Sequence, residues 1–209
     1  MSNRKIVLLK VLVWVACLYP LLKLLYGGFF GSLGPDPTRT ITFCTGLATI
    51  RLLVISLAIT PLRKLTPKLS WTIRFRRMLG LFAFFYASLH LFTYIGLYSY
   101  WDFHQLGTNI LKQRYVLVGM TAWLLLLPLA LTSTKGSIRR LGKRWTTLHK
   151  LVYFAAGLGV LHYWWLVKQG VLTPVWITLA LTLVLLARPV LNWINKRRQA
   201  AGERVESSV

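Results

Sequence analysis

The sequence predicts an all-α integral membrane protein: a six-helix transmembrane bundle with both termini in the cytoplasm. Of its 209 residues, 56% are hydrophobic and only four are acidic, and this composition does not suit the surface of a soluble protein. The apolar residues form repeated runs of about 20, the length that a helix needs to cross about 30 Å of hydrocarbon. The basic residues gather between these runs, and their distribution predicts the orientation of the bundle.

Six apolar runs follow one another along the chain, and each is predicted to be one membrane span. Turn-forming residues (GSLGPDP) follow the first run, and a polar aromatic stretch (YSYWDFHQ) follows the third. One membrane domain, residues 1–198, is predicted to contain all the spans, and residues 199–209 are predicted to be a short disordered cytoplasmic tail. The six predicted spans cover about 6–26, 41–62, 78–100, 115–134, 147–167 and 173–194.

The connections between the predicted spans alternate between being rich and poor in basic residues. Because cytoplasmic loops carry an excess of Lys and Arg, the rich connections and both termini are predicted to be cytoplasmic. An even number of spans agrees with this, since it returns the basic tail to the side of the basic N-terminus. The net charge of +22 is therefore interpreted as topology, and no nucleic-acid partner is expected. The rich clusters are Arg4 and Lys5; Arg63, Lys64, Lys68, Arg74, Arg76 and Arg77; Lys135, Arg139, Arg140, Lys143 and Arg144; and Lys196, Arg197, Arg198 and Arg204. The poor connections hold Arg39, then Lys112 and Arg114, then Lys168.

Three histidines, His90, His149 and His162, lie within predicted spans, whereas His104 lies in a loop. An ionisable side chain among lipid-facing residues is costly, so we expect these three to face the bundle interior. For any one of them, a hydrogen-bonded packing role between helices is an equally good interpretation. Three together, with no Asp or Glu in any predicted span, favour a shared function.

The depths of the three histidines predict two separate sites. At 1.5 Å per residue, His90 lies about 18 Å along the third span and His162 about 23–26 Å along the fifth, so the two can face one another in the outer half. His149 lies near the cytoplasmic face. Thirteen residues rotate an ideal helix by about 220°, so His149 and His162 do not share a face. Either Gly157 and Gly159 permit a local distortion, or the two histidines face different neighbouring helices.

Haem is the ligand that best suits histidines placed in this way. A catalytic zinc site usually needs three clustered protein ligands, and His149 is too far from His162 to join one. A proton relay would need carboxylates within the spans, and no Asp or Glu lies there. Haem iron needs only one or two axial imidazoles, because the macrocycle supplies its other ligands. Small residues that would let a porphyrin approach, or that simply pack helices closely, are Gly80, Ala83, Ala87, Gly119, Gly157 and Gly159.

Two arginines are candidate partners for an anionic cofactor. Arg51 lies near the middle of the second span and is predicted to bind a haem propionate, although it would equally snorkel or cap a carbonyl. Arg77 belongs to a set at the predicted inner face that would bind propionates there. The alternative for that set is topogenic charge attracted to anionic membrane lipid. The set is Arg74, Arg77, Arg140 and Arg144.

Nearly the whole chain resembles one family of membrane proteins. The motifs that carry the resemblance are LGPDP, LAITPLRKL, RRMLGLFAFFYASLHL and LTSTKGSIRRLGKRWTTLHKLVYFAAGLGVLHYWW. They are similar to the haem-binding membrane subunit of bacterial periplasmic protein-methionine-sulfoxide reductases, the MsrQ or YedZ family of the ferric-reductase-like transmembrane group.

The resemblance implies a b-type cytochrome of the bacterial inner membrane, with one or two b haems held by His90, His149 and His162. It implies electron transfer from a cytoplasmic flavin reductase or quinol to a periplasmic molybdopterin-containing methionine-sulfoxide reductase subunit. That partner, bound as a heterodimer, would hold the sulfoxide-reducing active site. FMN is also associated with the family, but no motif here places it. Members often carry His or Glu before the TG of the second span, where this chain has Phe43 and Cys44, so these two inherit no cofactor role.

Two other functions remain open at the level of sequence. A stand-alone quinol or ferric reductase would need its nicotinamide or flavin domain elsewhere, because this chain has no GxGxxG fingerprint. A small transporter with structural histidines is the other alternative. Pro128 would kink the fourth span in such a protein, but no inverted repeat is apparent.

Overall fold

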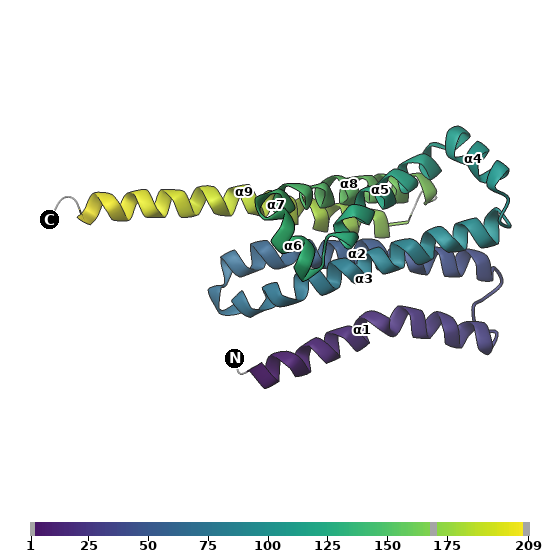
Figure 1. The fold of residues 1–209 in the computed structure, drawn as a ribbon, viewed down its shortest axis with the longest axis horizontal. Helices are drawn as coiled ribbons and strands as arrows, with labels where there is room; N and C mark the ends of the chain where they lie inside the picture. The colour runs from purple at the N-terminus through teal and green to yellow at the C-terminus, as the bar shows by residue number, and fades with distance from the viewer. Residues whose placement is uncertain (1–2, 168–170, 207–209) are drawn as a thin grey trace.

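The structure is a computed structural model and describes residues 3–167 and 171–206. Throughout these residues, every regular element is a helix. Figure 1 shows the long helices lying side by side, with both ends of the chain directed toward the same end of the bundle. The all-helical fold class is therefore confirmed.

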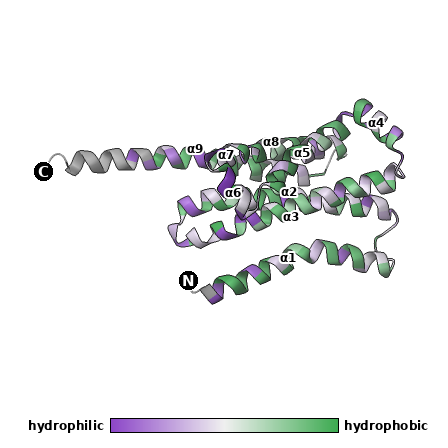
Figure 2. Ribbon diagram, viewed as in Figure 1, coloured by the Kyte–Doolittle hydropathy of each residue, from purple (hydrophilic) through white to green (hydrophobic). Residues whose placement is uncertain are grey.

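Five helical segments of the described chain are long and apolar enough to cross a membrane. The third segment extends beyond its α-helix through the short helix η1 (Pro67–Thr72) and the π-helical turn η2 (Tyr94–Tyr98). The five are built on α1 (Asn3–Phe29), α2 (Pro37–Leu65), α3 (Ile73–Thr93), α5 (Arg114–Leu131) and α9 (Thr173–Glu206). Green, apolar residues follow much of the length of α1, α2, α3 and α5 in Figure 2.

The fifth predicted span, 147–167, is not one continuous helix. The chain forms α7 (Lys143–Leu148), turns at His149 and Lys150, and continues as α8 (Leu151–Leu166). The 16 residues of α8 extend for about 24 Å, less than the 30 Å of an average hydrocarbon core. The interruption lies at His149–Lys150, and α8 continues through both glycines at which a distortion was expected. A membrane-spanning role for α8, and with it the count of six spans, stays a prediction.

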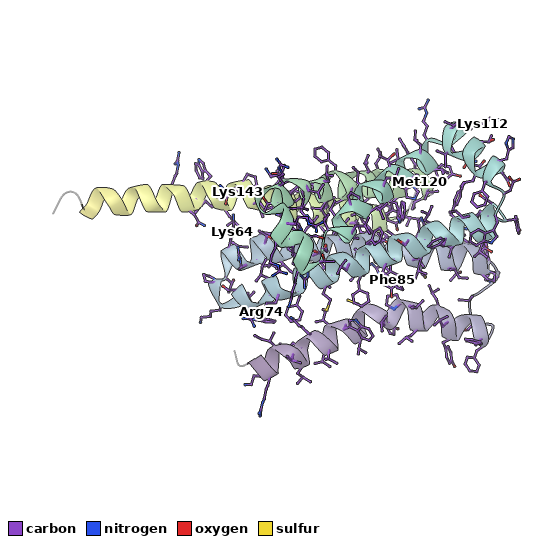
Figure 3. All side chains as sticks on the ribbon, viewed as in Figure 1. Lys64, Arg74, Phe85, Lys112, Met120 and Lys143 are labelled. Atoms are coloured by element: carbon purple, nitrogen blue, oxygen red, sulfur yellow. The ribbon has the colours of Figure 1, made fainter. Side chains whose placement is uncertain are left out.

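The basic clusters lie toward one end of the bundle. Figure 3 places Lys64, Arg74 and Lys143 toward that end and Lys112 at the other. We call the first the basic end. The second is the α4 end, after the amphipathic helix α4 (Phe103–Lys112) that lies there. At the basic end, α6 (Lys135–Leu141) precedes α7.

Two of the four acidic residues serve as helix caps. Asp36 accepts a hydrogen bond from the backbone N–H of Arg39 at the start of α2, and Asp102 accepts one from Gln105 at the start of α4, each at 2.9 Å. Such caps satisfy backbone donors that have no partner within the helix. These carboxylates therefore have a structural role in the connections.

Two helix pairs enclose the core. The most extensive contacts join α2 to α3 and α5 to α8, while α9 packs against α2 and α8. Apolar side chains from all of these helices form one cluster between the pairs. Its most deeply buried members are Leu53, Leu57, Ala83, Ala155 and Ala156.

The first helix, α1, is joined to the bundle by Tyr86. Pro20 lies inside α1, where proline disrupts the helical hydrogen-bond ladder. The fully buried hydroxyl of Tyr86 donates to the carbonyl of Cys17 at 2.7 Å and accepts from the N–H of Leu21 at 3.2 Å. An uninterrupted helix would join these two backbone groups to each other. Tyr86 thus satisfies the backbone at the proline and holds α1 against α3.

The last helix is longer than expected. Residues 199–206, predicted to be disordered, continue α9 as a helix to Glu206. The sequence AAGERVE is rich in helix formers, and its single glycine costs only about 1 kcal/mol relative to alanine. Residues 207–209 of the predicted tail, and Lys168 of the last connection, lie outside the described residues.

Candidate functional site

Two cavities of the described chain are lined by histidines. The two-histidine cavity, of about 250 Å³, is lined by His90 and His162 together with residues of α2 and α5. The one-histidine cavity, of about 460 Å³, is lined by His149. Leu53 and Leu126 line both, so the two cavities are neighbours that share a wall. The first includes the tyrosines near the α4 end, and the second includes basic residues of the basic end.

His90 and His162 face one another, as their depths predict. Their ring centroids are 5.9 Å apart, and the rings are nearly perpendicular at 87°. His90 comes from α3 and His162 from α8, so each helix pair contributes one imidazole. Both rings line the same cavity, so the fold brings two imidazoles from different helix pairs to one site.

Both imidazoles are fixed by backbone carbonyls of the neighbouring helix. His90 Nδ1 donates to the carbonyl of Thr42 at 2.9 Å, and His162 Nδ1 donates to that of Tyr115 at 2.7 Å. A carbonyl only accepts, so Nδ1 carries the proton, and in the neutral ring Nε2 keeps its lone pair. A metal-binding histidine usually donates its other ring N–H to a carbonyl or carboxylate in this way.

The Nε2 atom of His162 is the clearest indication of a ligand. It is buried and has no hydrogen-bond partner among the residues that the structure describes. A buried polar atom without a partner is costly, and coordination of a metal would remove that cost. Two opposed imidazoles with one such nitrogen fit the axial ligands of haem iron.

His149 is held in a different way, in the turn between α7 and α8. Its ring stacks on Trp145 with centroids 3.8 Å apart, and its Nδ1 donates to the Trp145 carbonyl at 3.1 Å. The Trp145 indole in turn donates to the carbonyl of Thr132 at 3.0 Å. The structure therefore separates His149 from the other two histidines, as the sequence predicts.

The two candidate arginines differ in position. Arg77 lines the one-histidine cavity together with its neighbour Arg76, which the sequence analysis assigned only to a topogenic cluster. Arg51 is exposed on α2 and lines neither cavity, so the structure does not bring it to the histidines. The sequence places Arg51 at the right depth, but its rotation about the helix axis directs it away from the core.

Arg188 is a cation within a predicted span that the sequence analysis missed. It lies on α9, where it donates from Nη2 to the carbonyl of Leu57 at 2.7 Å and from Nη1 to the hydroxyl of Tyr153. Its guanidinium carbon also lies 4.9 Å from the centre of the Tyr153 ring. Leu57 and Tyr153 both line the one-histidine cavity, so Arg188 supports the wall of that cavity.

Pro61 explains why Arg188 is needed. The carbonyl of Leu57 would normally accept from the N–H four residues later, but position 61 is a proline and has none. In a membrane, each backbone group must find a partner within the protein. A proline in one span and an arginine in another can therefore be recognised in the sequence. Only the fold shows that the arginine donates to the carbonyl that the proline leaves without a partner.

The small residues play several roles. Gly119 lies against the His162 ring and Gly159 against Ile50, while an added Cβ at Gly157 would meet nothing within 4 Å. Ala83 and Ala87 are buried in the core, and Gly80 lines the one-histidine cavity. Across the described residues, no three His, Cys, Asp or Glu side chains form a metal-binding group, so an all-protein metal site finds no support there.

Comparisons with known proteins identify a family of membrane proteins. The family described as ferric reductase like transmembrane component matches residues 45–160 of this chain. The matched range contains His90, His149 and the first part of α8, which ends at Leu166. The protein-methionine-sulfoxide reductase haem-binding subunit MsrQ of Xanthomonas euvesicatoria is 44% identical over 96% of this chain and 94% of its own length. The chain belongs to the MsrQ family.

A second MsrQ relative, from Herminiimonas arsenicoxydans, is 40% identical over 96% of this chain and 93% of its own length. A third, from Xanthomonas axonopodis, is 46% identical over 83% of this chain. No solved structure matches the chain. The names of these MsrQ relatives describe them as haem-binding subunits of protein-methionine-sulfoxide reductases.

Proposed function

We propose that this chain is the electron-carrying b-type cytochrome subunit of a protein-methionine-sulfoxide reductase. The opposed pair of His90 and His162, with the unpartnered Nε2 of His162, is the observation that supports it most directly. Haem b, when bound, supplies reversible one-electron transfer. The chain's own residues fix the ligand orientation, exclude water with the apolar core, and separate two cofactor positions along the bundle.

Each histidine has an assigned role in this proposal. His90 and His162 would hold one haem, and His149 would hold a second group in the one-histidine cavity. The protein would then carry one or two b haems. Arg77 and Arg76 provide positive charge for the anionic edge of the group at that second position. FMN is the other candidate for the same cavity, where basic side chains suit the flavin phosphate and aromatic side chains suit the flavin ring.

The proposed topology has six spans in the bacterial inner membrane with both termini in the cytoplasm. Its support is the gathering of basic residues at one end of the bundle. In that orientation the one-histidine cavity lies nearer the cytoplasm. Electrons from a cytoplasmic flavin reductase or from quinol would reach that cavity first. They would pass to the two-histidine cavity and then to a periplasmic molybdopterin-containing partner, which forms the heterodimer and reduces methionine sulfoxide.

The direct test is a reduced-minus-oxidised absorption spectrum of the protein purified from haem-replete cells. We expect the bands of a b-type cytochrome, with one or two haems per chain. A colourless protein would contradict the proposal. Separate reduction by a flavin reductase and by a quinol identifies the donor. Co-purification with the molybdopterin subunit distinguishes an electron relay from a stand-alone reductase.

A further inference from the structure

Each histidine of the two-histidine cavity lies against a glycine of the neighbouring helix. A Cβ added at Gly46 of α2 would lie 3.1 Å from Nδ1 and Cε1 of His90. A Cβ added at Gly119 of α5 would lie 2.7 Å from Nδ1 and 2.8 Å from Cε1 of His162. Contacts of this length are closer than ordinary van der Waals contact, so the imidazoles occupy the space that a side chain would fill.

The glycine and the hydrogen-bonding carbonyl have the same spacing in both helices. Thr42 accepts from His90 and precedes Gly46 by four residues; Tyr115 accepts from His162 and precedes Gly119 by four. Within an α-helix, the carbonyl of residue i accepts from the N–H of residue i+4. Each histidine therefore donates to a carbonyl whose helical partner is the glycine. The Thr42 carbonyl also accepts from the hydroxyl of Thr45, at 3.0 Å.

This spacing has a simple steric reason. A carbonyl oxygen has two lone pairs, and the helix uses one. A side chain at position i+4 projects beside that oxygen and restricts access to the second lone pair. Glycine leaves it open, so an imidazole from the adjacent helix can approach and donate. The same arrangement occurs on α2 for His90 and on α5 for His162.

We infer that Gly46 and Gly119 are positioning residues for the two haem ligands. Each, with the carbonyl four residues before it, fixes the ring plane of its histidine and the Nδ1–H that makes Nε2 a better ligand. The inference rests on the proposed haem function and extends it to two residues of the cavity wall that lie against the histidines. Gly119 leaves less space than Gly46, so substitution there has the larger effect.

The test compares Gly119→Ala and Gly46→Ala with the matched control Gly157→Ala in the purified haem-bearing protein. Gly157 also lies within a helix, but an added Cβ there meets nothing within 4 Å. Because alanine is the better helix former, none of the three substitutions weakens its own helix. The measurements are haem content per chain, the midpoint potential, and the low-spin spectrum of the haem held by His90 and His162.

We expect the affinity of Gly119→Ala for this haem to fall roughly tenfold or more. Losses of this size are seen when the hydrogen-bond partners of metal ligands are removed. Gly46→Ala should keep haem but show a shifted midpoint potential, because a shift of a few tenths of an ångström accommodates its Cβ. Gly157→Ala should match the wild type. If Gly119→Ala does not fold, the midpoint potential of Gly46→Ala tests the inference by itself.

Wild-type haem content, potential and spectrum in Gly119→Ala would overturn the inference, as would an unchanged potential in Gly46→Ala. Equal effects of all three substitutions would also overturn it. These outcomes leave the proposed function intact. A wild-type protein without haem would instead contradict the proposed function, and the inference with it.

Discussion

The two cavities hold their histidines by different means. His90 and His162 donate to carbonyls 48 and 47 residues away in sequence, each on the neighbouring helix. His149 donates to the carbonyl of Trp145, four residues earlier in the same turn, and stacks on its ring. The geometry of the first cavity therefore depends on how helices pack, whereas that of the second depends on a local turn.

The two cavities also differ in charge. Arg76, Arg77 and Lys150 line the one-histidine cavity. No lysine or arginine of the described chain lines the two-histidine cavity. A ligand with anionic groups is accordingly attracted to the first, while the second offers imidazole, hydroxyl and apolar surface. In the proposed function, the basic end would therefore recognise charge, and the two-histidine cavity would hold a metal.

Replacing the histidines should give the largest effect and separate the two sites. We expect His162→Ala and His90→Ala each to abolish the haem signal of the two-histidine cavity, because each removes one of two axial ligands. His149→Ala should leave that signal intact and remove only a second signal. Haem content and the reduced-minus-oxidised spectrum of each purified variant measure this. Loss of all haem from every variant would show that the cavities are not independent sites.

Removing Arg188 should destabilise the fold to a moderate degree. We expect Arg188→Met to lower the free energy of unfolding by about 1–3 kcal/mol, because it leaves the Leu57 carbonyl without a donor. Thermal unfolding in detergent measures the effect. In this substitution the two-histidine cavity should keep its haem, since Arg188 supports only the wall of the other cavity.

Pro61→Ala provides the control for that explanation. Alanine restores the N–H that the Leu57 carbonyl lacks, so Arg188→Met should cost less in the Pro61→Ala background than in the wild type. The difference is a coupling free energy between the two positions. Equal costs in both backgrounds would mean that Arg188 stabilises the protein mainly through Tyr153.

The smallest effect is expected from the exposed arginines. Arg77→Gln should weaken retention of the cofactor in the one-histidine cavity by up to about fivefold, because a solvated charge contributes only about 0.2–1 kcal/mol. Arg51→Gln, which lines neither cavity, should change nothing. Titration of cofactor into the stripped protein measures both. An effect of Arg51→Gln as large as that of Arg77→Gln would restore the role that its depth predicts.

The depth of each candidate site residue along its helix could be predicted from the sequence, but its contacts could not. Residue counts along the spans correctly paired His90 with His162 and set His149 apart. They also favoured Arg51, because depth says nothing about the direction in which a side chain points. Gly46 and Arg188 were missed for a related reason: their roles depend on an imidazole and a proline in other helices.

The sequence by itself determined the membrane helices, the basic end and the order of the histidines along the bundle. These follow from hydropathy, charge and residue spacing, which are properties of position along the chain. Only the tertiary structure decided which helices pair, where the fifth span breaks, and which carbonyl accepts from each histidine. Lipid is as apolar as the protein core, so a spanning helix carries little sequence signal for its buried face. Contacts with the neighbouring helices fix that face.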